Sequence, residues 1–390
     1  MNPRHRLGLS SWALTLFLVS AILGVGFHPA AAAPLFSSPP PAPARLQISA
    51  WMPTSWDGEI ARASFRAHSD WLDALSPFWY GVRQDGSLAP LKGARDADLL
   101  AEARYAGVRV FPTISNQYNG DRIHAILNDE VLAAAHRQAI VDEVMRYQYD
   151  GIDLDYEGLL SEDKDLFSAW VQALASDLHA RGKWLTITVQ AKTFDATGWD
   201  GPGAQDYRAL AATADELRIM TYGWCWRTGC VGGDPPGPIA PVHWMQRVIA
   251  YAKTQTAAEN IVLGVHLYGY DWWEESNSLA PPTPLALEDM TGEALVWEQA
   301  EALRRTHEAE LQWWEEDDRG KVQEPWFSYD NDGHVVVFAN ADSIAARAQL
   351  AAEEGLRGII FWRLGGEDPA LWDQLPRRMH RAYLPTLVRK

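Results

Sequence analysis

The chain has 390 residues, of which 47% are hydrophobic and 22% are charged, a composition typical of a globular protein with ample apolar material for a core. A formal net charge of −17 and the lack of a basic stripe argue against a nucleic acid as partner. The length suits two or three small domains or one large α/β barrel.

The N-terminus has the order of a secretory signal. Two arginines precede an apolar stretch from Trp12 to Phe27, and four alanines follow at 30–33. We therefore expect residues 1–33 to be a cleaved signal peptide. An uncleaved membrane anchor is the alternative, because the stretch approaches spanning length. Cleavage would leave the protein secreted, or periplasmic and associated with the cell wall, without membrane attachment. Residues 34–45 contain five prolines and are typical of an extended linker.

Eight short apolar runs alternate with helical patterns along the rest of the chain. Strands that alternate with helices form parallel sheets, and eight such units predict a (β/α)8 barrel, a TIM barrel, over residues 46–385. A doubly wound open sheet is the alternative, but no glycine-rich phosphate loop follows the first run. The predicted strands are Leu46–Trp51, Leu75–Tyr80, Val108–Ile114, Gly151–Tyr156, Leu185–Val189, Leu217–Tyr222, Ile261–Leu267 and Gly358–Trp362.

The gap between the seventh and eighth predicted strands is too long for one helical connection. It contains a helical pattern at Ala294–Arg305 and a hairpin pattern built from Glu310–Trp314, Trp326–Tyr329 and Val335–Phe338. We expect a small α+β insertion at about residues 285–340, on the top face of the barrel.

Three carboxylates on the fourth predicted strand carry the strongest chemical signal. Asp153, Asp155 and Glu157 are spaced at i, i+2 and i+4, so a strand places all three on one face. The apolar spacers suit the face that packs on helices, which turns the carboxylates into the barrel. Buried like charges cannot all ionise, so at least one pKa must rise. A proton held at neutral pH is what a general acid needs, whereas a calcium loop would have polar spacers.

The run from Asp150 to Glu157 has the pattern DxxDxDxE, which resembles the signature of glycoside hydrolase family 18, the chitinase-like barrels. Met220-Thr221-Tyr222 resembles the family's Met-x-Tyr motif, and Trp362 stands where the family has a tryptophan on the eighth strand. Four further stretches are similar to the spore-germination, cortex-lytic branch of the family: residues 217–224, 238–242, 263–272 and 358–368.

The resemblance implies a retaining mechanism in which the substrate's own acetamido oxygen attacks the anomeric carbon and the protein supplies no nucleophile. In that mechanism Glu157 would protonate the leaving oxygen and then activate water. Asp155 would orient the acetamido group, and Asp153 would pair with Asp155 and tune its protonation. Tyr222 would hydrogen-bond the acetamido oxygen, and Trp362 would form the floor beneath the reacting sugar.

Other positions complete the predicted site. Asp150, at the start of the strand, is expected to be structural. The family usually has an acid after Met-x-Tyr, and this chain has Gly223, which leaves substrate choice open. Stacking on a sugar and burial in the core are two equally good interpretations of Trp224, which is one of the further candidates. The further candidates for substrate contact are Asn116, Gln190, Met220, Trp224 and Tyr268.

Cys225 and Cys230 are the two cysteines of the chain and stand close together. In an exported protein they predict a disulfide, and two free thiols are the alternative. No histidine cluster accompanies them, so a zinc site is not expected, and we expect no metal and no cofactor.

The predicted function is that of a secreted glycoside hydrolase acting on a polysaccharide that contains N-acetylglucosamine. We expect the enzyme to cleave the β-1,4 bonds of peptidoglycan or its cortex form as the first choice of substrate, and those of chitin as the second. We expect the protein to act as a monomer. The alternative is a carbohydrate-binding lectin on the same barrel, which the intact Glu157 disfavours. Endo and exo action stay equally open.

Overall fold

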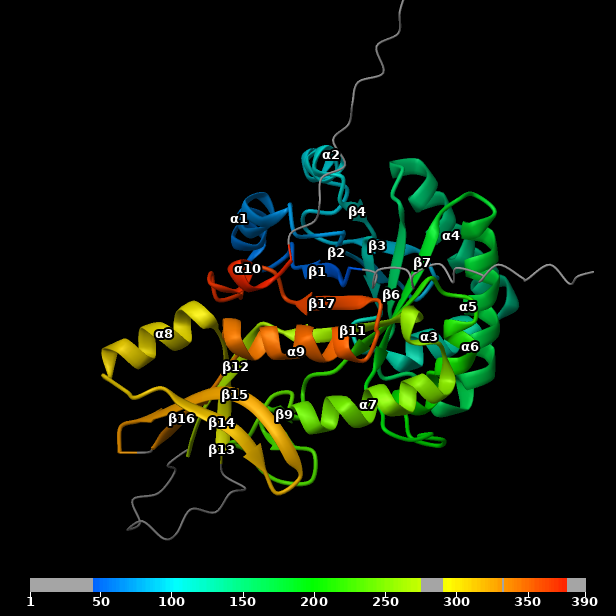
Figure 1. The fold of residues 1–390 in the computed structure, drawn as a ribbon. Helices are drawn as coiled ribbons and strands as arrows, with labels where there is room; N and C mark the ends of the chain where they lie inside the picture. The colour runs from blue at the N-terminus through cyan, green and yellow to red at the C-terminus, as the bar shows by residue number, and fades with distance from the viewer. Residues whose placement is uncertain (1–44, 275–289, 332, 377–390) are drawn as a thin grey trace, which may run out of the picture. The chain divides into compact units, whose positions relative to one another are not determined.

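The computed structural model describes residues 45–274, 290–331 and 333–376 (Figure 1). None of the helices in these ranges is long and apolar enough to cross a membrane. The following predicted segments lie outside the described residues: the signal peptide 1–33, the linker up to residue 44, residues 285–289 and 332 of the insertion, and residues 377–385 at the end of the barrel.

Eight parallel strands close into a ring within the described part of the chain. In chain order they are β1 (Gln47–Met52), β2 (Ala74–Val82), β5 (Thr113–Ser115), β6 (Gly151–Asp155), β7 (Trp184–Gln190), β8 (Glu216–Met220), β11 (Ile261–His266) and β17 (Gly358–Trp362). Around the ring the order is β1, β17, β11, β8, β7, β6, β5 and β2, and β2 pairs with β1 to close it. The predicted barrel is therefore confirmed, and the open sheet is excluded.

The third predicted strand is broken in two. β4 (Arg109–Val110) and β5 both pair with β2, and Phe111 and Pro112 separate them. Proline has no backbone N–H and cannot continue the ladder as a donor. Its carbonyl still accepts the backbone N–H of Asp153 at 3.0 Å, so the broken strand remains tied to β6. A short antiparallel strand, β3 (Leu88–Pro90), extends β2 outside the ring.

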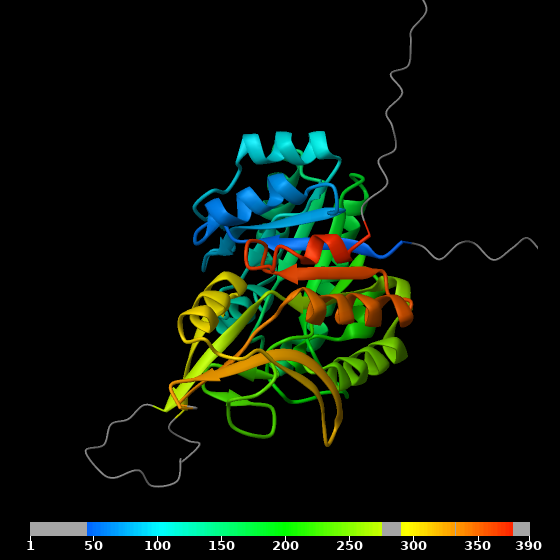
Figure 2. The same ribbon diagram turned by 60° about the vertical axis from the view of Figure 1, so that its left-hand side comes forward.

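Helices connect successive strands and lie outside the ring, as Figures 1 and 2 show. Gly107 ends one of them with a φ of 66°, a left-handed cap that glycine adopts without steric cost. The helices are α1 (Gly58–His68), α2 (Ala97–Ala106), α3 (Gly120–Leu127), α4 (Glu130–Tyr147), α5 (Lys164–His179), α6 (Tyr207–Ala211), α7 (Val242–Gln255), α9 (Ala341–Glu353) and α10 (Leu371–Gln374).

Strand alternation divides the buried side chains between two cores. On β6, Ile152 and Leu154 join the main core, which includes Phe167 of α5. A smaller apolar cluster contains Trp51 of β1 and Ile360 of β17. Because side chains on a strand alternate with a period of two, the aspartates of β6 fall on the opposite face from Ile152 and Leu154. The ring interior is therefore where the carboxylates of β6 lie.

An antiparallel sheet and one helix form the insertion between β11 and β17, drawn in yellow and orange in Figure 1. Among the described residues the sheet has five strands, β12 (Tyr268–Glu274), β13 (Met290–Val296), β14 (Gln312–Asp317), β15 (Gly320–Tyr329) and β16 (His334–Val337). Helix α8 (Trp297–Thr306) packs on β12 and β13 over a small apolar core. The α+β insertion is confirmed, and its sheet starts at Tyr268, directly after β11.

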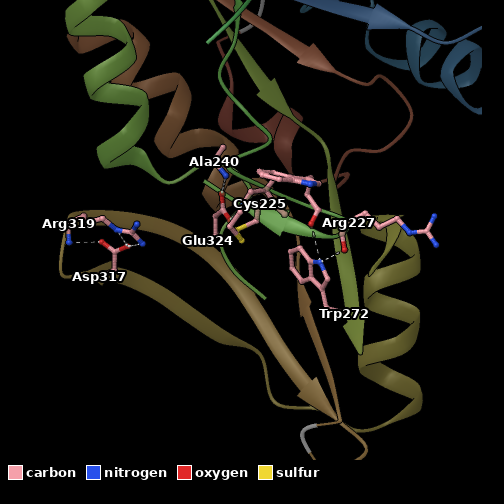
Figure 3. Close-up of a disulfide and its surroundings, with 10 residues drawn as sticks. Cys225, Arg227, Ala240, Trp272, Asp317, Arg319 and Glu324 are labelled. Atoms are coloured by element: carbon pink, nitrogen blue, oxygen red, sulfur yellow. Dashed lines mark hydrogen bonds and ion pairs between the residues drawn. A yellow bond between two sulfur atoms is a disulfide. The ribbon is translucent and has the colours of Figure 1, made fainter. Parts of the chain in front are cut away.

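A buried glutamate joins the insertion to the barrel. Glu324 of β15 accepts hydrogen bonds from the backbone N–H groups of Ile239 and Ala240, at 2.7 and 2.8 Å, in the loop before α7. Arg347 of α9 donates to the same carboxylate at 2.7 Å, and both charged side chains are fully buried. Figure 3 shows Glu324 pointing at Ala240 close to Cys225. This one carboxylate therefore ties β15 to two elements of the barrel.

The predicted disulfide is present. Cys225 and Cys230 are joined by an S–S bond of 2.06 Å, across the two short strands β9 (Cys225–Trp226) and β10 (Gly229–Cys230). A Cβ at Gly237 would lie 2.5 Å from the sulfur of Cys225, so the chain can pass this close to the disulfide only with glycine there. The bridge closes the loop that follows β8, above the carboxyl end of the barrel.

Removing Arg347 should destabilise the fold strongly, because Glu324 would stay buried without its cation. We expect Arg347→Met to lower the free energy of unfolding by about 3–5 kcal/mol. The matched control is Arg305→Met on α8, where the side chain is 71% exposed and pairs with Glu301 at 3.4 Å. That change should cost less than about 1 kcal/mol. Urea unfolding of both variants measures the difference, and equal losses would contradict the importance of the buried pair.

Candidate functional site

A cavity of about 180 Å³ opens at the carboxyl ends of the barrel strands. Asp155, the last residue of β6, and Glu157, two residues beyond it, both line the cavity, so the motif delivers two of its carboxylates there. Three further predicted residues line the same cavity: Met220, Tyr222 and Trp362. Trp51, Phe78 and Thr188 also line it, and the sequence analysis had not selected them.

Asp153 lies deeper in the ring and is fully buried. Its Oδ2 accepts hydrogen bonds from Trp51 Nε1 and Thr113 Oγ1, each at 2.9 Å. Its Oδ1 accepts from Thr186 Oγ1 at 2.8 Å, and Arg218 Nη1 lies 3.2 Å from the same oxygen. Trp51 and Arg218 can only donate, and the threonine hydroxyls donate here as well, so every one of these contacts suits a carboxylate oxygen as acceptor.

The two upper carboxyl groups lie in a different environment. Burial raises the pKa of Asp155 well above its ordinary value, and the charges of Glu157 and Asp153 raise it further. Burial also raises the pKa of Glu157, to about 7. In the described residues the buried Oδ1 of Asp155 has no hydrogen-bond partner. Because like charges this close cannot both ionise easily, the pair retains a proton at neutral pH.

Tyr222 and Trp362 reach the cavity from two other strands of the ring. Tyr222 lies two residues beyond β8, and burial raises its pKa above the ordinary value, so its hydroxyl keeps its proton and can donate. Trp362 ends β17 and packs its edge on Trp51 and Phe78, with ring centroids 6.0 and 5.0 Å apart. These contacts hold the indole of Trp362 as an aromatic wall beside the carboxyl pair.

Asn116 positions the acidic loop. Its side chain is fully buried, and its Nδ2 donates to the backbone carbonyl of Glu157 at 2.7 Å. The backbone N–H of Glu157 donates to Asn116 Oδ1 at 3.0 Å. The amide of Asn116 thus binds the backbone of Glu157, whereas a contact with sugar was predicted for it. Gln190 lies at the end of β7, with Nε2 3.4 Å from the hydroxyl of Tyr118, outside the cavity lining.

Two aromatic candidates lie away from the carboxyl cavity. Tyr268 lines a neighbouring cavity of about 420 Å³, which shares Trp362 with the first and includes Arg363. Trp224 is only 6% exposed, its ring lies 5.5 Å from that of Trp244, and the guanidinium of Arg319 covers it at 5.3 Å. Of the two interpretations left open for Trp224, burial in the core is the one that the structure favours.

The remaining motif positions are structural. The carboxylate of Asp150 accepts the backbone N–H of Val110 at 2.8 Å and so joins β4 to the start of β6. Gly223 has a φ of 79°, and a Cβ added there would meet no atom within 4 Å. The constraint at Gly223 is therefore the left-handed backbone and not lack of space.

Among the described residues no group of His, Cys, Asp or Glu side chains is placed to hold a metal ion.

Arg218, the cation that faces Asp153, was not among the predicted site residues. A signal for it was present, because Glu216, Arg218, Met220 and Tyr222 alternate along and just beyond β8 and share one face. A charged pair inside an otherwise apolar predicted strand points to the ring interior, as the aspartates of β6 do. Trp51 had the weaker signal of ending the first predicted strand.

Comparisons with known proteins agree with this geometry. The family model of Glycosyl hydrolases family 18 matches residues 69–367. The Cortical fragment-lytic enzyme of Bacillus subtilis (strain 168) is 29% identical over 350 residues, which cover 85% of this chain and 74% of that protein. The crystal structure of the Bacillus cereus spore cortex-lytic enzyme SleL superposes with a TM-score of 0.74 at 26% identity, over 86% and 75% of the two chains. A chitinase structure from Chromobacterium violaceum gives 0.71 at 25%, over 84% and 97%.

The raised pKa of Glu157 predicts a pH-dependent stability. A carboxyl group whose pKa is higher in the folded state adds stability below its ordinary pKa of 4.5, and that contribution disappears as the pH rises through about 7. Glu157→Gln, which is neutral at every pH, should therefore be more stable than the parent at pH 8 by about 1–3 kcal/mol and equal to it at pH 4. Urea unfolding at both pH values measures this gain.

The control for this measurement is Glu310→Gln, on the exposed segment before β14. It should leave the free energy of unfolding unchanged at both pH values. A Glu157→Gln gain that is the same at pH 4 and pH 8 would show that Glu157 titrates normally.

Proposed function

The chain belongs to family 18 of the glycosyl hydrolases, and we propose that it cleaves β-1,4 bonds next to N-acetylglucosamine by a retaining, substrate-assisted mechanism. The observation that carries this proposal is the pairing of Asp155 with Glu157 in one cavity, beside Tyr222 and Trp362. These side chains supply a proton donor, a partner for an acetamido group and an aromatic surface for a sugar ring.

Glu157 is the general acid and base of the proposed reaction. Its pKa of about 7 lets it carry a proton at neutral pH and still give that proton up. It protonates the oxygen of the leaving sugar while the acetamido oxygen of the substrate forms a bond to the anomeric carbon. The resulting carboxylate then takes a proton from the water that opens the cyclic intermediate, which restores the acid.

Asp155 and Tyr222 hold the acetamido group that acts as nucleophile. Asp155 accepts the N–H of the acetamido group and, once it is ionised, stabilises the positive charge of the oxazolinium intermediate. Tyr222 donates its hydroxyl proton to the acetamido oxygen and fixes its direction of attack. Trp362 stacks on the apolar face of the same sugar, so the ring cannot turn away from Glu157.

We propose cortex-type peptidoglycan as the first substrate and chitin as the second. Relatives named as cortex-lytic enzymes support the first, and a relative named as a chitinase supports the second. Both polymers present the N-acetyl group that the cavity would recognise. We also propose that the protein acts outside the cytoplasm, which the N-terminal signal pattern supports, as does a disulfide at Cys225–Cys230.

Replacing the acid tests the reaction and the substrate together. Glu157→Gln should lower kcat by about 10²–10⁴-fold, because the leaving sugar would have no proton donor. The assay uses chitooligosaccharides and purified cortex peptidoglycan, with the products identified by mass spectrometry. Glu310→Gln is the control and should match the parent. A parent protein that binds both substrates and cleaves neither would favour the lectin, and equal product from the parent and Glu157→Gln would exclude Glu157 as the acid.

The pH profile gives a second test. Because Glu157 must be protonated to release the leaving sugar, kcat/KM should fall about tenfold per pH unit above a pH of about 7. The measurement is the initial rate of oligosaccharide cleavage from pH 4 to pH 10. A rate that stays level up to pH 9 would assign the acid to another group.

A further inference from the structure

A fully buried arginine lies beneath the carboxyl pair. Arg218 of β8 donates through Nη1 to Ser76 Oγ at 2.7 Å and through Nε and Nη2 to Glu216 Oε2, at 3.0 and 2.9 Å. The same Nη1 lies 3.2 Å from Asp153 Oδ1. A guanidinium at this depth loses its hydration, so it is tolerated only because two carboxylates face it.

Positive and negative side chains balance beneath the cavity, but they do not balance at the carboxyl groups that line it. Glu216 also accepts Nε2 of Gln47 at 2.7 Å, and Arg109 lies 3.9 Å from it. Two cations thus serve two anions at the level of Asp153 and Glu216. In the part of the chain that the structure describes, no ion pair reaches the carboxyl groups that line the cavity.

Every neighbour of Asp153 on the surrounding strands is a donor or is neutral. Thr188 of β7 lies 3.2 Å from Oδ1 and adds to the donors already described on β1, β5 and β7. A proton on Asp153 would require a threonine hydroxyl to turn from donor to acceptor, and it would leave the guanidinium of Arg218 with one anion fewer. The contacts of Asp153 therefore favour the anion, and Asp153 would exert the tuning of Asp155 that the resemblance implies through its negative charge.

We propose that Arg218 is a positioning residue that holds Asp153 as a permanent anion and thereby confines the mobile proton of the site to Asp155 and Glu157. The proposal rests on the proposed function, and it adds the group that decides where the proton goes. Arg218 does not line the cavity, so it acts through Asp153 and not on the sugar. Its charge partly screens that of Asp153 and sets how readily Asp155 ionises above it.

Two substitutions should shift the pH profile in opposite directions. Arg218→Met removes the cation, so the negative charge of Asp153 is unscreened and the cluster binds protons more tightly. The acidic limb of kcat/KM should then move up by about one pH unit, with about a tenfold loss below it. Glu216→Gln removes an anion that competes for Arg218, so the same limb should move down. KM should change less than kcat in both variants, because neither residue touches the substrate.

Arg218→Lys and a stability measurement complete the test. Lysine keeps the charge, so Arg218→Lys should restore most of the parent profile. Limbs that shift in the same direction for Arg218→Met and Glu216→Gln, or a uniform loss at all pH values, would overturn the proposal. Should Arg218→Met not fold, as judged by thermal unfolding, Glu216→Gln decides alone, and an unshifted or upward limb overturns the proposal.

A readout without activity separates this proposal from the proposed function. In the Glu216→Gln background, the stability gain of Glu157→Gln should begin at a lower pH than in the parent, as measured by urea unfolding. A parent that is inactive on every sugar tested would reject the proposed function, while this shift in onset would still support the role of Arg218. An unchanged onset would overturn that role in an active enzyme.

Discussion

Burying Asp153 at the centre of the ring is the constraint on which the site depends. A carboxylate without water is stable only where donors replace its hydration shell, and no single strand can supply them all. Trp51, Thr113, Thr186 and Arg218 come from β1, β5, β7 and β8. The donors meet only when the strands of the ring come together, so the closure of the barrel and the burial of Asp153 depend on each other.

The charged side chains of the ring lie at two levels, one around Asp153 and one in the cavity above it. The lower level is neutral overall because each anion has a cation, and the upper level holds two acids in an apolar cavity between Trp51, Phe78 and Trp362. The negative charge of Asp153 beneath Asp155 and Glu157 favours the retention of one proton by this pair. Such a proton is what the proposed reaction would deliver to a glycosidic oxygen. Aromatic side chains that would bind a sugar also exclude the water that would otherwise weaken this effect.

The sequence predicts what alternation controls and misses what distant packing decides. The spacing of Asp153, Asp155 and Glu157 placed them on one face because a strand has no other periodicity. For Trp224 the sequence left sugar contact and burial equally open, because the residue that covers its ring, Arg319, lies nearly a hundred residues away. Asn116 gave no sign that its amide would bind the backbone of Glu157, since that contact exists only between neighbouring loops. The strands and the motif were thus foreseeable, and the alternation along β8 also carried a signal for Arg218, whereas nothing in the sequence indicated the backbone contact of Asn116.

The amide of Asn116 has a mechanical consequence for the acid. The side chain of Asn116 binds both the N–H and the carbonyl of Glu157, so the backbone of Glu157 is held in place. In the proposed reaction, only the torsions of the side chain would move the carboxyl group of Glu157 from the leaving oxygen to the incoming water. Proton delivery and proton recovery would then differ by a small side-chain rotation about a fixed backbone, so the sugar would have to bind within reach of that rotation.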